Sequence, residues 1–565
     1  MTESRNNKAP TGRRTPKSSS IRWAPKEIDV KPRRQFIILG LFLVGGLVAY
    51  STVLNSWFLS DDFAQIGKVL SGDFSVVWGQ AQGGFFRPLF ILSYLVDTKI
   101  WGARPFGFHL TNVAFHSLNA FLTFVLSLRF VEDLKLTAGA KRMIAIGAGA
   151  LFLLHPSHTE AGSWISGRAD VLATFFCLAS LWSSLSYARS TRPAQLAVSL
   201  MCFTIALLAK ESAICLPFLV LVVGLVIGPA QKKGKSLRQF LLVMALYFLI
   251  LLVFIAVRSF FIGSLVGGYG VSQHLNFSPT WLRDRLLEAS VRSVLPSLPS
   301  QLSRFLFKPL QSLVFLSFSL VCAGLVAAAI VLRRNWYGPD DLKEQNRFLL
   351  TLVALFLFSL LPVINLRLTL YQTQGERFLY LPTVFSCLLM AYLAAILVRR
   401  RTLWLAILIC VLGFYAVTLY QTNRSWSEAA QLSRSITDEL VDSSTRDRLV
   451  ILNAPDNLRG VPVFHNGLSE ALEYFQNRKR FKQVEIIAFQ DFQSAADEVA
   501  ITARPGSLSI QPLSDHDSFV RLEPSECLET TAQSRTSLEL HLKPCAADAD
   551  LFFFDRGRMT RLTDR

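Results

Sequence analysis

Two adjacent carboxylates, Asp61 and Asp62, follow directly on the first long apolar run of the chain, which ends in Trp57-Phe58-Leu59-Ser60. Two neighbouring acids at a membrane-water boundary disfavour each other's ionisation and call for a basic partner. A carboxylate in such a place can take the proton of an attacking hydroxyl. The pair is therefore the first candidate for a catalytic base, and the sequence does not distinguish between its two members.

Four basic residues stand at other predicted membrane ends: Arg87 in FFRPLF, Arg168 in SGRADV, Lys210 in LLAKES and Arg377 in GERFLY. Such side chains bind phosphate through charge-assisted hydrogen bonds, although Lys210 could equally form a neutralising pair with Glu211. Acids and cations at one face suit a reaction in which a base activates a hydroxyl while an anionic, membrane-held group departs. The sequence has no Gly-rich phosphate loop, which disfavours a nucleotide donor.

Further polar residues at the same predicted face are expected to line a cavity: His109, His155, His158, Glu160, Asp170, Glu211 and Glu376. His109 belongs to a helical stripe with Asn112, His116 and Asn119, and the other three are interpreted as hydrogen bonds between helices. His155, His158 and Glu160 are metal-ligand types, but their spacing matches no zinc signature. No metal ligand is assigned, and a divalent metal stays possible.

The composition and the apolar runs indicate which elements position these residues. Of the 565 residues 51% are hydrophobic, 44 of them Phe, and a membrane-spanning helix needs about 20 apolar residues. Apolar runs occur at 35–58 and near 107–128, 143–155, 170–188, 194–209, 212–229, 239–262, 310–332, 347–366, 378–398 and 402–421. These runs predict a mostly α, polytopic helical bundle of about 11 spans.

The basic residues indicate the orientation of this bundle. The net charge of +18 is gathered in short clusters between apolar runs, which is typical of cytosolic loops and does not indicate nucleic-acid binding. Residues 1–35 are predicted to be a disordered basic cytosolic tail, and 36–423 the transmembrane domain. Asp61, Asp62 and the C-terminus then lie on the extracytoplasmic side.

Residues 424–565 are polar and predict a soluble extracytoplasmic α/β or α+β domain. Expected strands are RLVILNAP, VEIIAF, EVAITA, SLSIQPL, FVRLE, SLELHL and DLFFF, with a helical stretch near Leu468 to Gln476. Cys527 and Cys545 lie in this polar sequence, and a disulfide and two free thiols are both open.

Five blocks in order, FFRPLFILSYLVD, FGFHLTNVAFHSLNAFL, HPSHTEAGSWISGRADVL, LLAKESAI and GERFLYLP, run through most of residues 57–426. Together with the acidic pair in the first extracytoplasmic loop, they resemble the GT-C superfamily of glycosyltransferases, and within it the transmembrane and tetratricopeptide-repeat O-mannosyltransferases and their bacterial relatives. The resemblance implies an inverting transfer from a polyprenyl-phosphate sugar. It implies Asp61 or Asp62 as base, and Arg168, Lys210 and Arg377 near the donor phosphate.

The expected function is therefore a membrane glycosyltransferase acting on a protein or glycan acceptor. Its rivals are a lipid-linked-sugar transporter or flippase and a non-catalytic membrane anchor for the end domain. After Trp426 the sequence shows no 34-residue helical repeat, which departs from the narrower family. This end domain favours a bacterial inner membrane, and the sequon Asn276-Phe277-Ser278 keeps an ER membrane as the alternative.

Overall fold

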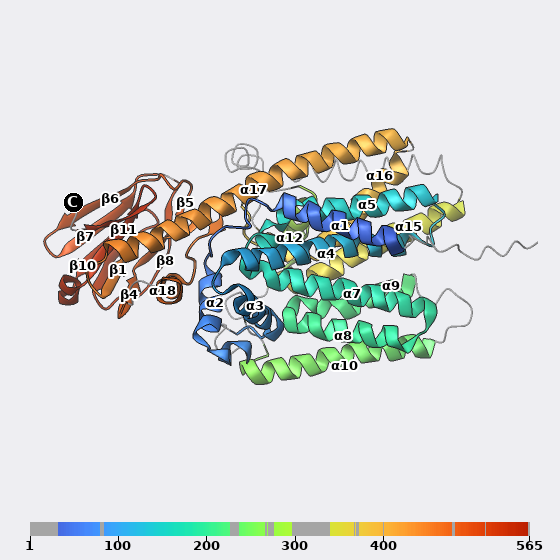
Figure 1. The fold of residues 1–565 in the computed structure, drawn as a ribbon, viewed down its shortest axis with the longest axis horizontal. Coiled ribbons are helices and arrows are strands. Elements are labelled where there is room, and N and C mark those ends of the chain that lie inside the picture. The colour runs from blue at the N-terminus through green and yellow to red at the C-terminus, as the bar shows by residue number, and fades with distance from the viewer. Residues whose placement is uncertain are drawn as a thin grey trace, which may run out of the picture.

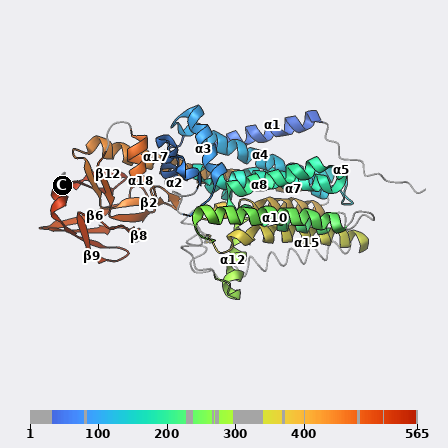
Figure 2. The same cartoon turned by 90° about the horizontal axis from the view of Figure 1, so that it is seen from below.

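The computed structural model describes residues 32–562 apart from 79–83, 227–236, 266–267, 269–275, 296–338, 367, 369–371, 399, 477–480 and 515. Within these residues the protein is mostly helical, with a sheet region at its C-terminal end. Figures 1 and 2 show this sheet region at one end of the helix bundle, next to α2 (Asp61–Ser71).

Apolar helices form the bundle: α1 (Pro32–Ala49), α4 (Pro105–Val131), α5 (Ala138–Leu154), α7 (Arg168–Ser190), α8 (Pro193–Ala209), α9 (Leu216–Val226), α10 (Leu237–Ile262), α15 (Pro339–Leu360), α16 (Pro382–Leu397) and α17 (Arg401–Ser443). Five of the described helical segments are long and apolar enough to cross a membrane. The protein is thus an integral membrane protein. Each of these helices overlaps a predicted span, and the predicted span at 310–332 lies outside the described residues.

The first span is shorter than predicted. Helix α1 ends at Ala49, and the chain then turns, with the Ser51 hydroxyl donating to the Val48 carbonyl at 2.9 Å. This turn brings Phe58, which was predicted inside the span, into a fully buried aromatic group with Phe108, at a centroid distance of 5.7 Å. The residues just before Asp61 therefore belong to a layer of short elements at one end of the bundle, called the end layer below.

Short elements build this layer over one end of the bundle. They are α2, η1 (Phe74–Trp78), α3 (Pro88–Trp101), η2 (Pro156–His158), α6 (Thr159–Gly162), η3 (Ile165–Gly167), η4 (Glu211–Cys215), α12 (Pro279–Arg292), η6 (Leu361–Val363) and η7 (Glu376–Leu379). Proline at the first turn starts α3, and Gly72 with a φ of 79° ends α2. These elements carry most of the candidate site residues.

Helix α17 is continuous across the predicted boundary at 423/424. It runs from the bundle to Ser443, beside the sheets of the C-terminal domain (Figure 1). Beyond Asn423 it keeps one buried face, with Trp426, Ala430, Ser433 and Thr437 at helical spacing. The predicted transmembrane domain and the C-terminal domain are therefore joined by a helix that belongs to both.

The C-terminal domain contains three four-stranded sheets, in the orders β12-β11-β1-β4, β6-β7-β10-β9 and β3-β2-β5-β8. The strands are β1 (Arg448–Ile451), β2 (Ala454–Leu458), β3 (Val461–Pro462), β4 (Gln483–Ile486), β5 (Ala488–Phe492), β6 (Val499–Arg504), β7 (Ser507–Pro512), β8 (Ser518–Leu522), β9 (Leu528–Gln533), β10 (Leu538–Leu542), β11 (Asp550–Asp555) and β12 (Arg558–Arg561). β1 pairs in parallel with β4 and β11, and β2 in parallel with β5, while the other strand pairs are antiparallel.

All seven predicted strand segments contain a strand, and helical turns α18 (Leu468–Glu470) and η8 (Ala471–Phe475) occupy the predicted helical stretch. The sequence reasoning missed β3, β9 and β12. β9 was missed because its sequence, LETTAQ, is exposed beyond its first residue and has no apolar alternation. Cys527 and Cys545 are free thiols in the structure.

The C-terminal domain shares one hydrophobic core with this end layer. Phe63 of α2 stacks on Phe464 at a centroid distance of 5.9 Å, and Phe58 lies 4.8 Å from Phe475. Because the first loop and the domain bury the same apolar surface, they are held as one packed unit.

Candidate active site

A cavity of about 800 Å³ lies where α2, α3, α6 and η7 meet the C-terminal domain. Its volume is within the range typical of small-molecule sites. The charged and titratable side chains that line it are those of Asp61, Lys68, Arg87, Glu160, Arg377, His465 and Glu470. The cavity therefore places a carboxylate beside several cations at the end of an apolar bundle.

Asp61 lies at the first position of α2 and faces this cavity. Its Oδ1 accepts a hydrogen bond of 2.7 Å from Nδ2 of Asn466, a residue of the C-terminal domain. The amino end of a helix favours a negative charge. Asp61 is partly exposed, so its carboxylate can meet a ligand in the cavity.

Asp62 is turned the other way and is only 1% exposed. Its Oδ2 accepts from the Leu59 amide at 3.0 Å, while its Oδ1 accepts from the Ser166 amide at 2.8 Å and from the Ser166 hydroxyl. Burial raises the pKa of Asp62 to about 7, and these hydrogen bonds oppose that rise. The side chain fastens the first loop to η3 and lies outside the cavity lining that the described residues form.

Arg87 and Arg377 line the cavity, each beside a carboxylate. Arg87 donates to Glu211 through Nε at 2.9 Å and Nη2 at 2.5 Å, and its guanidinium lies 4.1 Å from the Phe85 ring centroid. Arg377 donates to Glu160 through Nη1 at 2.9 Å and through its backbone amide at 2.8 Å. Burial raises the pKa of Glu160, and Arg377 opposes this rise.

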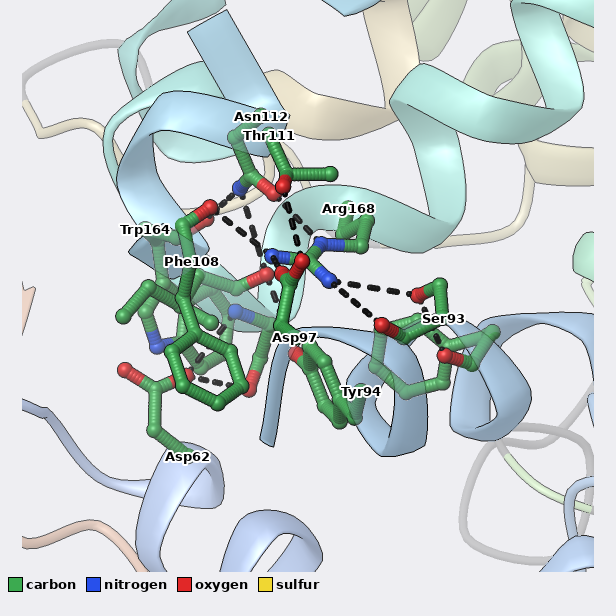
Figure 3. Close-up of polar contacts among 12 residues, drawn as sticks. Asp62, Ser93, Tyr94, Asp97, Phe108, Thr111, Asn112, Trp164 and Arg168 are labelled. Atoms are coloured by element: carbon green, nitrogen blue, oxygen red, sulfur yellow. Dashed lines mark hydrogen bonds and ion pairs between the residues drawn. The ribbon is translucent and has the colours of Figure 1, made fainter. Parts of the chain in front are cut away.

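Arg168 and Lys210 were predicted to bind the donor phosphate, and the structure places both elsewhere. Arg168 is fully buried, with its guanidinium 2.6 Å from both Asp97 Oδ2 and Asn112 Oδ1 (Figure 3). Lys210 is 2% exposed and pairs with Asp170 at 2.6 Å. A charge in an apolar bundle requires a partner, so these two cations form internal ion pairs outside the cavity lining of the described residues.

Of the seven residues expected to line a cavity, some lie at this cavity and the others are buried elsewhere in the protein. Glu160 lines the cavity, and Glu211 reaches its edge through Arg87. The other five are buried in contacts within the protein: His109 with the Ser56 carbonyl, His155 with the Ser293 carbonyl, His158 with the Thr383 hydroxyl, Asp170 with Lys210, and Glu376 with Arg292. Among the described residues no three His, Cys, Asp or Glu side chains are grouped to hold a metal ion.

Sequence reasoning missed several residues of the cavity, including all of those on the C-terminal domain. Nδ1 of His465 lies 3.0 Å from Asp456 Oδ1, and the hydrogen bond to Asp456 raises the pKa of His465. Asn466 and Glu470 follow on the same segment, and Lys68 lies on α2. The Asn466–Asp61 contact joins residues 405 positions apart, so no local pattern could have indicated it.

No family model matches the sequence. Among curated proteins, the chain is 33% identical over 187 residues to protein O-mannosyl-transferase Tmtc1 of Drosophila melanogaster, covering 30% of this chain and 20% of the relative. It is 26% identical over 398 residues to human protein O-mannosyl-transferase TMTC4, covering 62% of this chain and 53% of the relative. The chain resembles the TMTC protein O-mannosyl-transferases. The resemblance predicted from the five sequence blocks is thereby confirmed.

The matched regions span about a fifth to a half of the length of these TMTC relatives. Among solved structures, ArnT from Cupriavidus metallidurans in the apo state covers 79% of this chain and 85% of its own, with 12% identity and a TM-score of 0.42. The same protein bound to undecaprenyl phosphate gives 14% identity and a TM-score of 0.34, covering 89% of this chain and 97% of its own.

Proposed function

We propose that this protein is an integral-membrane glycosyltransferase, which moves a sugar from a polyprenyl-phosphate donor to an acceptor hydroxyl at the extracytoplasmic face. The observation that carries the proposal is the joint lining of one cavity by Asp61, Arg87 and Arg377 at the end of an apolar bundle. The resemblance to protein O-mannosyl-transferases supports sugar transfer as the reaction.

In the proposed reaction Asp61 accepts the proton of the acceptor hydroxyl as its oxygen attacks the anomeric carbon of the sugar. The bond from that carbon to the phosphate oxygen breaks, and its electron pair stays on the polyprenyl phosphate. A single displacement of this kind inverts the configuration at the anomeric carbon. The protonated Asp61 returns its proton to solvent after the product leaves.

Arg87 and Arg377 stabilise the charge that returns to the phosphate. Their guanidinium groups are planar and can hold a phosphate with parallel hydrogen bonds. Glu211 and Glu160 fix their orientation, and the rings of Phe85 and Trp164, 4.1 Å and 4.9 Å from the guanidinium carbons, fix the plane of each. Preorganised charges of this kind lower the cost of the transition state because they need little rearrangement.

The acceptor is proposed to be a protein or glycan hydroxyl that reaches the cavity beside the C-terminal domain. The bundle is proposed to have about 11 spans, with its N-terminus in the cytosol and residues beyond 424 outside. The basic loops support this orientation, because positive residues stay on the cytosolic side. A bacterial inner membrane is the proposed location, with the ER membrane as the alternative in a eukaryote.

The test uses the purified full-length protein in proteoliposomes with a panel of short-chain polyprenyl-phosphate hexoses and peptide or oligosaccharide acceptors. We expect transfer from at least one donor, loss of turnover in Asp61→Asn, and reduced turnover in Arg87→Lys and Arg377→Lys, because lysine keeps the charge but lacks the planar fork. Arg283→Lys is the matched control, since Arg283 is exposed on α12 and pairs with Asp284.

Full turnover in Asp61→Asn would refute the assignment of the base. Movement of an intact lipid-linked sugar across the vesicle without transfer would instead support a transporter. A parallel series with EDTA tests metal dependence: a loss that Mn²⁺ or Mg²⁺ restores would show that the reaction needs a divalent ion.

A further inference from the structure

A single turn of the C-terminal domain, residues 463–467, is docked on the start of α2. The Ser60 amide donates to the Val463 carbonyl at 2.9 Å, and the Asn466 amide donates to the Ser60 hydroxyl at 3.3 Å. The Asn466 side chain then donates through Nδ2 to Asp61 Oδ1 at 2.7 Å. Three hydrogen bonds therefore join this turn to Ser60 and to the proposed base Asp61, which is the first residue of α2.

The backbone on both sides of this contact is unusual. Ser60 has a φ of 49°, in the left-handed region that side chains rarely adopt, and Gly467 has a φ of 89°. A Cβ added to Gly467 would lie 2.6 Å from the Ser60 carbonyl oxygen, so only glycine permits this approach. Strained backbone persists where the surroundings hold it, and here the surroundings are the C-terminal domain.

We propose that Asn466 is a positioning residue for the base Asp61, which makes the C-terminal domain part of the active site. The inference rests on the proposed function. Bound through Oδ1, the Asp61 carboxylate keeps one orientation, and its second oxygen is available to the acceptor hydroxyl.

Other charged and titratable groups line the same cavity. They are Lys68 on α2, Arg87 directly before α3, Glu160 on α6, Arg377 on η7, and His465 and Glu470 on the C-terminal domain. Asn466→Ala leaves all of these charges unchanged. A fall in kcat at constant donor KM in this variant can therefore be attributed to the lost hydrogen bond with Asp61.

The experiment compares Asn466→Ala and Asn466→Asp with wild type, using full-length protein in the transfer assay. In Asn466→Ala we expect kcat to fall about tenfold, the low end for a hydrogen bond to a charged group, with donor KM little changed. In Asn466→Asp we also expect a lower kcat, because an ionised carboxylate cannot donate a hydrogen bond to Asp61.

Gln533→Ala is the matched control, because Gln533 carries the same amide on the exposed edge strand β9 of the same domain. Its kcat and KM should equal those of wild type. Asn466 is exposed, so both variants should keep the wild-type thermal midpoint, and the near-isosteric Asn466→Asp, which lacks the N–H donor, gives the kcat readout even if Asn466→Ala folds poorly. A wild-type kcat in both variants, while Asp61→Asn is inactive, would overturn the inference and leave the proposed function standing. An active Asp61→Asn would overturn the proposed function itself.

Discussion

Replacing either member of the Asp61–Asp62 pair by asparagine is the same chemical change at adjacent positions, yet the structure predicts opposite consequences. Asp61 is partly exposed in the cavity, and an asparagine there can still accept from Asn466 through its remaining oxygen. Stability should therefore change by only about 0.5 kcal/mol or less. Turnover should fall about 10²- to 10⁴-fold, because that is the usual contribution of a general base.

Asp62→Asn should instead lower the stability of the folded protein. Both carboxylate oxygens accept from backbone amides, those of Leu59 and Ser166, and a carboxamide has only one oxygen to offer. One buried N–H must then face the new amino group, which costs about 1–3 kcal/mol. Turnover per folded molecule should stay within a few-fold of wild type.

The pH dependence of stability adds a second measurement on Asp62. Its pKa is raised to about 7 in the folded protein, against about 3.9 for an unfolded aspartate. The folded state therefore binds the extra proton, so this residue's contribution is complete below about pH 4 and is lost as the pH rises through about 7. Asp62→Asn should lack this decline.

The assay measures the thermal midpoint in detergent by tryptophan fluorescence from pH 4 to 8, and turnover normalised to folded protein. Asp61→Asn should keep the midpoint and lose turnover. Asp62→Asn should keep turnover and have a lower midpoint at about pH 4, where the contribution of Asp62 is complete, and the difference from wild type should shrink as the pH rises through about 7. If Asp62→Asn were the inactive variant at an unchanged midpoint, Asp62 would be the base and the orientation derived from the cavity would be wrong.

The ion pairs and the docked turn lead to three further predictions. Arg168→Ala should cost about 3–5 kcal/mol and reduce the yield of folded protein, because Asp97 is left buried without its partner. Asp456→Asn should lower the pKa of His465, which a ¹³C-histidine titration measures. In the wild type the His465–Asp456 pair stabilises the fold at low pH, and this contribution is lost as the pH rises through the raised pKa of His465. Gly467→Ala should cost about 1–3 kcal/mol in stability, seen as a lower thermal midpoint, and should lower turnover, because the turn can no longer approach α2.

The apolar runs were sufficient to predict the helices of the bundle, since the length needed to cross a bilayer is a property of the chain itself. The predicted end of the first span was wrong because Phe58 is as apolar in a folded loop as in a membrane helix. Short runs rich in apolar residues likewise predicted most strands, whereas β9, exposed along most of its length, had no such pattern.

The site was harder to predict, because the presence of a charged residue in the sequence does not show which side chain it pairs with in the fold. Arg168 and Arg377 occur in similar short motifs, but Asp97 and Asn112 enclose the first, while the second reaches the cavity. Asp61 and Asp62 differ only in the direction each leaves its helix. Asn466 could not be predicted for another reason, since its proposed role depends entirely on how the C-terminal domain packs against α2.

The unbroken α17 has a mechanical consequence. At about 1.5 Å per residue its 43 residues form a rod roughly 65 Å long, and a helix of this kind bends only gently without proline or a similar interruption. The C-terminal domain is thus mounted on α17 without a hinge within that helix. The proposed function then requires donor and acceptor to reach the cavity without a displacement of this domain.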